Sequence, residues 1–203
     1  MGRVVALRHG ETDWNRNRRM QGWAPVPLND RGRDQAAAAG RWISDRYDVD
    51  RIIASDLERT RETADIVSET LDTDVPLGHE HYWRERDIGI YQGLGYEDVG
   101  ERFPAFSLGE SGYRAVDRTP EGGESLLDVY ERVSGRFEEL RTEANGETIL
   151  VVSHGGPINL LLGHVKGMDV ETALRTHHQE NCAVNEIDAI TPDVVRENHT
   201  EWR

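Results

Sequence analysis

The chain has 203 residues, with 38 acidic and 24 basic side chains, and its formal net charge at pH 7 is −14. Binding free nucleic acid requires a basic face, so this balance argues against a nucleic-acid partner. The apolar stretches are too short for a secretory leader or a membrane span, and without low-complexity spacers the length predicts one domain over residues 1–203.

Two residue types indicate the environment of the protein. Lysine occurs once, at Lys166, so the acidic surface resembles that of proteins adapted to high salt, where ions screen repulsion between carboxylates. Cys182 is the only cysteine, which excludes an internal disulfide and predicts a reducing, cytoplasmic location. We interpret Cys182 as a small buried side chain and not as a reactive thiol.

The first predicted element is a buried strand at residues 4–6, and Arg8, His9 and Gly10 follow at its end. Arg8 offers a planar set of donors that suits phosphate oxygens, and Gly10 allows the backbone to approach an anion. Taken alone, His9 could be a nucleophile, a base or a hydrogen-bonded loop residue. In open α/β sheets this edge is where ligands bind.

A polar loop is predicted next, over residues 11–28, and loops of this length in compact domains are often functional. Its Trp14 and Trp23 could line a substrate entrance or pack the loop itself. A helix over about residues 30–47, capped at Asn29 or Asp30, follows the loop.

A second buried strand at residues 51–54 leads directly into Ser55-Asp56-Leu57-Glu58, which has the form of a capping box. We therefore predict a helix from this box to about Leu71. Arg59 lies in its first turn, where the helix N-terminus also favours anions, whereas Arg61 should face solvent.

Glu85 is predicted to lie on a loop, after a short strand near residues 75–77, because glycines at 89, 93 and 95 interrupt regular structure. Asp87 is an alternative acid on the same loop. The following insert, at about residues 94–119, mixes helical and irregular segments and is the predicted lid or specificity region.

The last third of the chain repeats the strand–helix pattern. A helix with apolar positions at helical spacing spans residues 126–140, and the clearest buried strand, residues 148–152, ends in Ser153-His154-Gly155-Gly156. Pro157 suits the first turn of another helix. Residues 183–187 and 194–197 are predicted to be one or two edge strands. The alternation predicts an α/β fold with a mostly parallel central sheet, helices on both faces and the small insert above the active site.

Several motifs, in this order and spacing, together resemble the histidine phosphatase superfamily, in the branch that contains cofactor-dependent phosphoglycerate mutases and similar phosphatases. They are Leu7 to Thr12 with Asn15 and Gly22, Ser55 to Thr60, Glu85 with Gly89 and Gly93, Pro120 to Ser125, and Ser153 to Gly156.

The resemblance implies that His9 is the nucleophile that accepts the phosphoryl group as a phosphohistidine. Arg8, Arg59 and His154 would hold the phosphoryl oxygens, and Glu85 would be the general acid for the leaving oxygen. The resemblance also implies substrate contacts at Thr12, Asn15, Gln21, Gly22 and Gly155.

The chemistry of phosphoryl transfer suits these residue types. Its loose, charge-spread transition state requires positioning and positive donors, which two arginines and a second histidine supply without a metal. His9 attacks only when neutral, and a backbone carbonyl near Gly10 could hold its other ring nitrogen. Glu85 would have to be kept protonated, by burial or by the incoming phosphate dianion. The pairs His79–His81 and His177–His178 lack further metal ligands, so no metal site is predicted.

Three functions are compatible with this pattern. The insert holds no lysine and only the separated Arg102, Arg114 and Arg118, whereas mutases of this family grip a substrate carboxylate with a lysine and an adjacent arginine pair. Gly156 also stands where those mutases have asparagine. We therefore predict a metal-independent phosphatase of small phosphorylated metabolites, with no cofactor. The alternatives are a mutase, which would need 2,3-bisphosphoglycerate, and an inactive phosphate-binding module. The natural substrate and the oligomeric state stay open.

Overall fold

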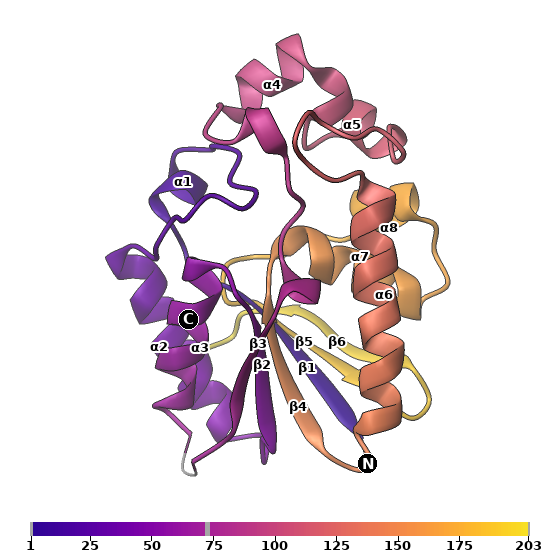
Figure 1. The fold of residues 1–203 in the computed structure, drawn as a ribbon. Helices are drawn as coiled ribbons and strands as arrows, with labels where there is room; N and C mark the ends of the chain where they lie inside the picture. The colour runs from indigo at the N-terminus through magenta and orange to yellow at the C-terminus, as the bar shows by residue number, and fades with distance from the viewer. Residues whose placement is uncertain (1, 72–73, 203) are drawn as a thin grey trace.

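The computed structural model describes residues 2–71 and 74–202, so the ends of the predicted domain, residues 1 and 203, lie outside the described residues. Its centre is a six-stranded sheet in the order β3-β2-β4-β1-β5-β6 (Figure 1). The strands are β1 Arg3–Arg8, β2 Arg51–Ser55, β3 Leu77–Glu80, β4 Thr148–Ser153, β5 Val184–Asp188 and β6 Asp193–His199. Strands β3, β2, β4 and β1 are parallel, while β5 runs antiparallel to β1 and β6 antiparallel to β5. This confirms the mostly parallel sheet.

Helices cover both faces of the sheet, as predicted (Figure 1). On one face lie α2 (Asp30–Ser44) and α3 (Glu58–Ser68), and on the other lie α6 (Leu126–Glu143), α7 (Gly155–Val165) and α8 (Val170–Thr176). The remaining helical segments are α1 Asp13–Arg16, α4 Tyr96–Arg102 and α5 Glu110–Arg114, with 3₁₀ turns η1 His81–Trp83, η2 Gly89–Tyr91 and η3 Pro104–Phe106. Helices α2 and α3 each end three residues before the predicted ends.

Alternate residues of β1 pack into two different cores. Val4 and Ala6 belong to the core under α6, α7 and α8, whereas Val5 and Leu7 belong to the core under α2 and α3. All four are fully buried, at 0% exposure, which explains why a strand covered on both faces has a continuous apolar sequence. Burying each larger apolar side chain stabilises the fold by roughly 1.5–3 kcal/mol.

Two local predictions were wrong. Ser55 is the last residue of β2 and not a helix cap, because α3 begins at Glu58 and its N-cap Leu57 makes no side-chain capping bond. The Ser55 hydroxyl lies 2.9 Å from His154 Nε2 instead. The other error concerns β5, which is not an edge strand: it pairs with β1 on one side and β6 on the other, so its neighbours bury it.

The insert lies above the carboxyl ends of the strands (Figure 1) and is joined to the loop at residues 11–28. Backbone bonds link Tyr96 N to Arg18 O at 2.8 Å and Met20 N to Leu94 O at 2.9 Å. Met20 also packs with Val99 of α4 in a small separate core. In the part of the chain that the structure describes, no helix combines the length and apolarity that crossing a membrane requires.

Candidate active site

His9 lies directly after β1 and is buried, with 2% of its surface exposed. Its Nδ1 is 2.7 Å from the carbonyl oxygen of Gly10. Because a carbonyl oxygen only accepts, Nδ1 carries the proton and Nε2 the lone pair. The structure therefore supplies the backbone carbonyl that the sequence led us to expect near Gly10.

Both histidines of the site are neutral in the free protein. Burial, followed by repulsion from Arg59 and Arg8, holds the pKa of His9 well below its usual value. Burial and then Arg59 have the same effect on the pKa of His154. The two rings meet edge to face, with centroids 5.2 Å apart. They come together because β1 and β4, the strands that precede them, are neighbours in the sheet.

Arg8 and Arg59 bring two guanidinium groups to the same place. Arg8 Nη1 donates to Gln179 O at 2.5 Å, and Arg59 Nη2 donates to Gly22 O at 2.8 Å. Burial lowers the pKa of Arg59 to about 10, so this side chain stays charged at neutral pH. Within the described residues, the Nε atoms of Arg8 and Arg59 and Nδ1 of His154 are buried without a hydrogen-bond partner. Unpaired buried polar atoms of this kind indicate a site for a ligand that supplies their partners.

Glu85 lies between η1 and η2, on a loop as predicted. Its Oε1 accepts from Arg86 N at 2.9 Å and its Oε2 from Gly156 N at 3.3 Å, at the N-terminus of α7. Asp87 lies differently: its carboxylate accepts from Gly89 N at 2.9 Å, and Asp87 is absent from the described residues that line the cavity. The geometry therefore favours Glu85 as the acid.

Arg8, His9, Arg59 and Glu85 line one cavity of about 360 Å³ beneath the insert. Of the residues predicted from the sequence, its walls include Arg8, His9, Asn15, Gln21, Gly22, Arg59, Glu85 and Gly155. His154 and Thr12 are not among the wall residues that the structure describes. The His154 ring packs against the His9 ring, and the Thr12 hydroxyl caps α1 by accepting from Asn15 N at 3.0 Å.

The sequence reasoning missed part of the cavity wall. Arg86, Asn159 and Gln179 line the cavity near the reacting groups, and the insert adds Tyr96, Phe106, Ser107, Leu108 and Tyr113. Burial raises the pKa of Tyr96 and that of Tyr113, so both phenols are uncharged donors. For the residues of the insert, the only sequence signal was the predicted position of the insert, which did not identify individual side chains.

The two tryptophans of the 11–28 loop pack the structure. The Trp23 indole N–H donates to Glu85 O at 2.7 Å, and its ring lies 4.3 Å from the Arg84 guanidinium. Trp14 lies against Gly93, where a Cβ would be 3.3 Å from the ring. Neither tryptophan is among the described wall residues of the cavity, so the packing alternative holds.

Among the described residues, the histidine pairs do not belong to a group of side chains that could hold a metal ion. In residues 2–71 and 74–202, no three or more His, Cys, Asp or Glu side chains are arranged to hold a metal ion. His177 Nδ1 lies 2.9 Å from Ala173 O, whereas His178 lines the cavity mouth and pairs with Glu180.

The buried neutral histidines should make stability depend on pH. His9 and His154 have pKa values below 6.5 in the folded protein, so as the pH falls through 6.5 the unfolded chain takes up protons that the folded protein does not. The free energy of unfolding should therefore decrease below pH 6.5, by up to about 1.4 kcal/mol per pH unit for each histidine. Urea unfolding between pH 5 and 7 measures this slope, which should be shallower in His9→Ala. An equal slope in the variant and the wild type would contradict a lowered pKa of His9 in the folded protein.

Comparisons with known proteins agree with this geometry. The family model of the histidine phosphatase superfamily (branch 1) matches residues 4–197. Phosphoglycerate mutase-like protein 4 of Arabidopsis thaliana is 36% identical over 158 residues, which are 78% of this chain and 68% of that protein. The uncharacterized phosphatase PhoE of Bacillus subtilis is 32% identical over 171 residues, which are 84% of this chain and 81% of that protein.

A solved structure shares the whole architecture. The mycobacterial glucosyl-3-phosphoglycerate phosphatase in complex with VO3 superposes with a TM-score of 0.79 and 29% identity, over 93% of each chain. The motifs, the fold and the family model lead to one conclusion: this chain belongs to branch 1 of the histidine phosphatase superfamily.

Proposed function

We propose that the protein is a metal-independent phosphatase that hydrolyses small phosphorylated metabolites through a phosphohistidine at His9. The observation that carries the proposal is the tautomer of His9, whose protonated Nδ1 is held by Gly10 O and whose Nε2 carries the lone pair. The unpaired donors of Arg8 and Arg59 beside it suit the oxygens of a phosphoryl group.

In the first step, the Nε2 lone pair of His9 forms a bond to phosphorus while the bond from phosphorus to the ester oxygen breaks. The Glu85 carboxyl gives its proton to that leaving oxygen, which departs as an alcohol. Arg8 and Arg59 stabilise the charge spread over the phosphoryl oxygens.

In the second step, water attacks the phosphorus of the phosphohistidine. The Glu85 carboxylate takes a proton from this water, the bond from Nε2 to phosphorus breaks, and inorganic phosphate leaves. His9 regains its lone pair and Glu85 its proton, so the protein returns to its starting state.

A phosphatase is favoured over a mutase by the position of the acid. A Cβ placed on Gly156 would lie 2.5 Å from Glu85 Oε1, so the carboxylate occupies the space of a side chain at this position. Among the described wall residues, the insert contributes aromatic, apolar and hydroxyl groups, while Arg102, Arg114 and Arg118 lie elsewhere. We therefore do not propose that the insert binds a substrate carboxylate in the way that mutases do.

The Gly156→Ala variant tests the position of the acid. The added methyl group should displace the Glu85 carboxylate, a flexible side-chain end, and lower kcat by roughly ten- to a hundredfold with little change in Tm. Gly135→Ala is the matched control, because a Cβ there meets nothing within 4 Å. Unchanged kcat in Gly156→Ala would show that the carboxylate does not act from this position.

Metal independence is tested with a chelator. Phosphatase activity should be the same before and after dialysis against EDTA, because the proposed charge stabilisation comes from Arg8 and Arg59. Loss of activity that a divalent cation restores would reveal a metal ion in the reaction.

Phosphorus NMR of the protein with 3-phosphoglycerate and a trace of 2,3-bisphosphoglycerate, in high salt, tests the reaction class. Growth of the inorganic phosphate signal supports the phosphatase, whereas growth of 2-phosphoglycerate establishes the mutase and overturns the proposal. If neither signal grows, p-nitrophenyl phosphate in the same tube decides: hydrolysis supports a phosphatase with another natural substrate, and no hydrolysis overturns the proposal in favour of an inactive phosphate-binding module.

A further inference from the structure

The loop that carries Glu85 is held by side chains that take no part in the proposed reaction. The carbonyl oxygen of Glu85 accepts two hydrogen bonds, from Arg132 Nη2 at 3.0 Å and from Trp23 Nε1 at 2.7 Å. The two donors come from different parts of the fold, Arg132 from α6 and Trp23 from the 11–28 loop. The backbone of Glu85 is therefore held both by α6 and by the 11–28 loop.

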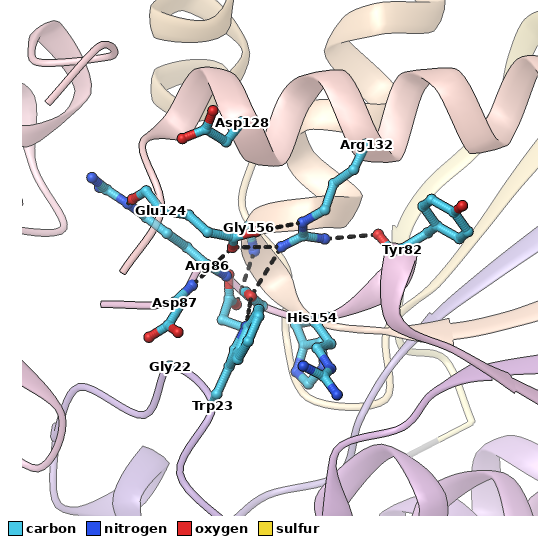
Figure 2. A network of polar contacts seen from close by, with 12 residues as sticks. Gly22, Trp23, Tyr82, Arg86, Asp87, Glu124, Asp128, Arg132, His154 and Gly156 are labelled. Carbon is cyan, nitrogen blue, oxygen red and sulfur yellow. Dashed lines mark hydrogen bonds and ion pairs between the residues drawn. The ribbon is translucent and has the colours of Figure 1, made fainter. Parts of the chain in front are cut away.

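Arg132 holds the same loop at further points. Its Nη1 donates to Tyr82 O at 2.7 Å, ahead of Glu85 in the chain. Its Nε and Nη2 both donate to the carboxylate of Glu124, at 3.0 Å each, and Glu124 Oε2 accepts from Asp87 N at 3.0 Å (Figure 2). The Arg132 guanidinium thus connects α6 to Tyr82 before the acid and to Glu85 itself. Through Glu124 it is also connected to Asp87 after the acid.

The contacts of Arg132 suit the guanidinium group of an arginine. Only 13% of the Arg132 side chain is exposed, and its donors are directed to three acceptor groups in a fixed planar geometry. A lysine at the same position has one ammonium group, which cannot reach all three groups at once. Near Glu85 the described backbone bonds are Arg84 N to His81 O at 3.1 Å and Glu124 N to Asp87 O at 2.8 Å, which do not reach Glu85 itself. Arg84 and Arg86 hold the neighbouring residues through Asp56 and Glu124 O, and the bonds of Arg132 and Trp23 hold the Glu85 backbone, with its carboxylate beside Gly156 N.

We propose that Arg132 is a positioning residue for Glu85: it fixes the backbone of the acid so that the carboxyl faces the oxygen of the leaving alcohol. This inference rests on the proposed function, because it assumes that Glu85 gives a proton to the leaving group. Displacing a reacting group by about 1 Å costs roughly a hundredfold in rate, so a loosened loop is expected to slow proton donation.

Arg136 provides a matched control on the same helix. It lies one turn after Arg132, and 10% of its side chain is exposed. Its partners in the described part of the chain are Glu80, Glu139 and Glu143, which lie outside the Glu85 loop. Arg132→Lys and Arg136→Lys therefore make the same chemical change at similar burial, and only the first should alter the position of the acid.

The test compares kcat/KM for two substrates that differ in their need for a proton. Phenyl phosphate has a poor leaving group and requires the acid, whereas p-nitrophenyl phosphate has a good leaving group and depends on it less. Arg132→Lys should lower kcat/KM for phenyl phosphate by roughly tenfold or more and for p-nitrophenyl phosphate by about twofold. Arg136→Lys should leave both values unchanged.

Glu85→Gln separates failure of this inference from failure of the proposed function. If Glu85→Gln loses activity selectively with phenyl phosphate and Arg132→Lys does not, Arg132 is only structural and the inference is overturned. If Arg132→Lys loses kcat/KM equally with both substrates, Arg132 is again only structural and the inference is overturned. If Glu85→Gln itself shows no selective loss, the acid role of Glu85 is overturned, and the inference with it.

A second variant keeps the test decisive if Arg132→Lys does not fold. Trp23→Phe keeps an aromatic ring beside Arg84 and removes only the other hydrogen bond to the Glu85 carbonyl. It should show the same selective loss with phenyl phosphate, to a smaller extent. If a folded Trp23→Phe variant loses the same fraction of its kcat/KM with both substrates, or loses none, the inference that this carbonyl positions the acid is overturned.

Discussion

Replacing His9 with alanine is expected to reduce phosphatase turnover by roughly 10⁴-fold or more, because the nucleophile itself is lost. The fold should be retained, since within the described part of the chain the ring makes one hydrogen bond, from Nδ1 to Gly10 O. Hydrolysis of p-nitrophenyl phosphate measures turnover, and circular dichroism with thermal unfolding checks the fold.

A trapping experiment accompanies the His9→Ala variant. Wild-type protein quenched during turnover should carry an acid-labile phosphoryl group, visible as a mass increase, and His9→Ala should carry none. His79→Ala is the control, because His79 is an exposed residue of β3, away from the cavity. Substantial turnover in a folded His9→Ala variant would refute the phosphohistidine mechanism.

Replacing Arg59 with methionine should lower kcat/KM by about 10³-fold, the effect of removing an arginine that stabilises charge in phosphoryl transfer. Arg59 is buried, with 1% of its surface exposed, so its charge acts in a poorly solvated site. Methionine fills much of the same space and leaves the carbonyls of Gly22 and Ala24 without this donor. The variant is therefore expected to fold with a lowered Tm.

Phosphate binding distinguishes loss of the charge from general damage. Inorganic phosphate should raise the Tm of wild-type protein, because it binds the folded state, and should have a much smaller effect on Arg59→Met. Arg61→Met is the control: Arg61 is exposed, lies on the same helix and donates to Asp56 O at 2.8 Å. An equal Tm shift in Arg59→Met and wild type would show that Arg59 does not contact the phosphoryl group.

Much of the candidate site could be predicted from the sequence because its residues lie at the carboxyl ends of strands or within a few residues after them. Apolar runs locate the strands, the parallel arrangement brings their ends to one edge, and His9, Arg59 and His154 then come together. The neutral, carbonyl-bound state of His9 also follows from what an imidazole nucleophile requires. The structure confirms these local consequences of pattern and chemistry.

The remaining parts of the site depend on contacts between distant segments. The carbonyl of Gln179 accepts from Arg8, and the side-chain amide of Asn181 donates to His9 O at 3.1 Å. These partners are separated by 171 and 172 residues, and no periodic pattern marks them. Ser55 was misassigned for the same reason, because its hydroxyl lies 2.9 Å from His154, which follows another strand, and accepts only a long bond of 3.4 Å from Leu57 N. The insert could be placed but its side chains could not, because short helices and turns leave no clear periodicity.

The strand order has a consequence for how the protein is made. The strand that precedes the nucleophile is synthesised well before β4 and β5, yet it pairs with both, so that Arg3 lies opposite Thr148 and Asp188. Both partners emerge from the ribosome only after most of the chain, and closing such long loops is slow. A growing chain therefore has no assembled phosphoryl pocket until β4 and β5 are in place beside β1, and catalytic activity can report directly on the formation of this sheet.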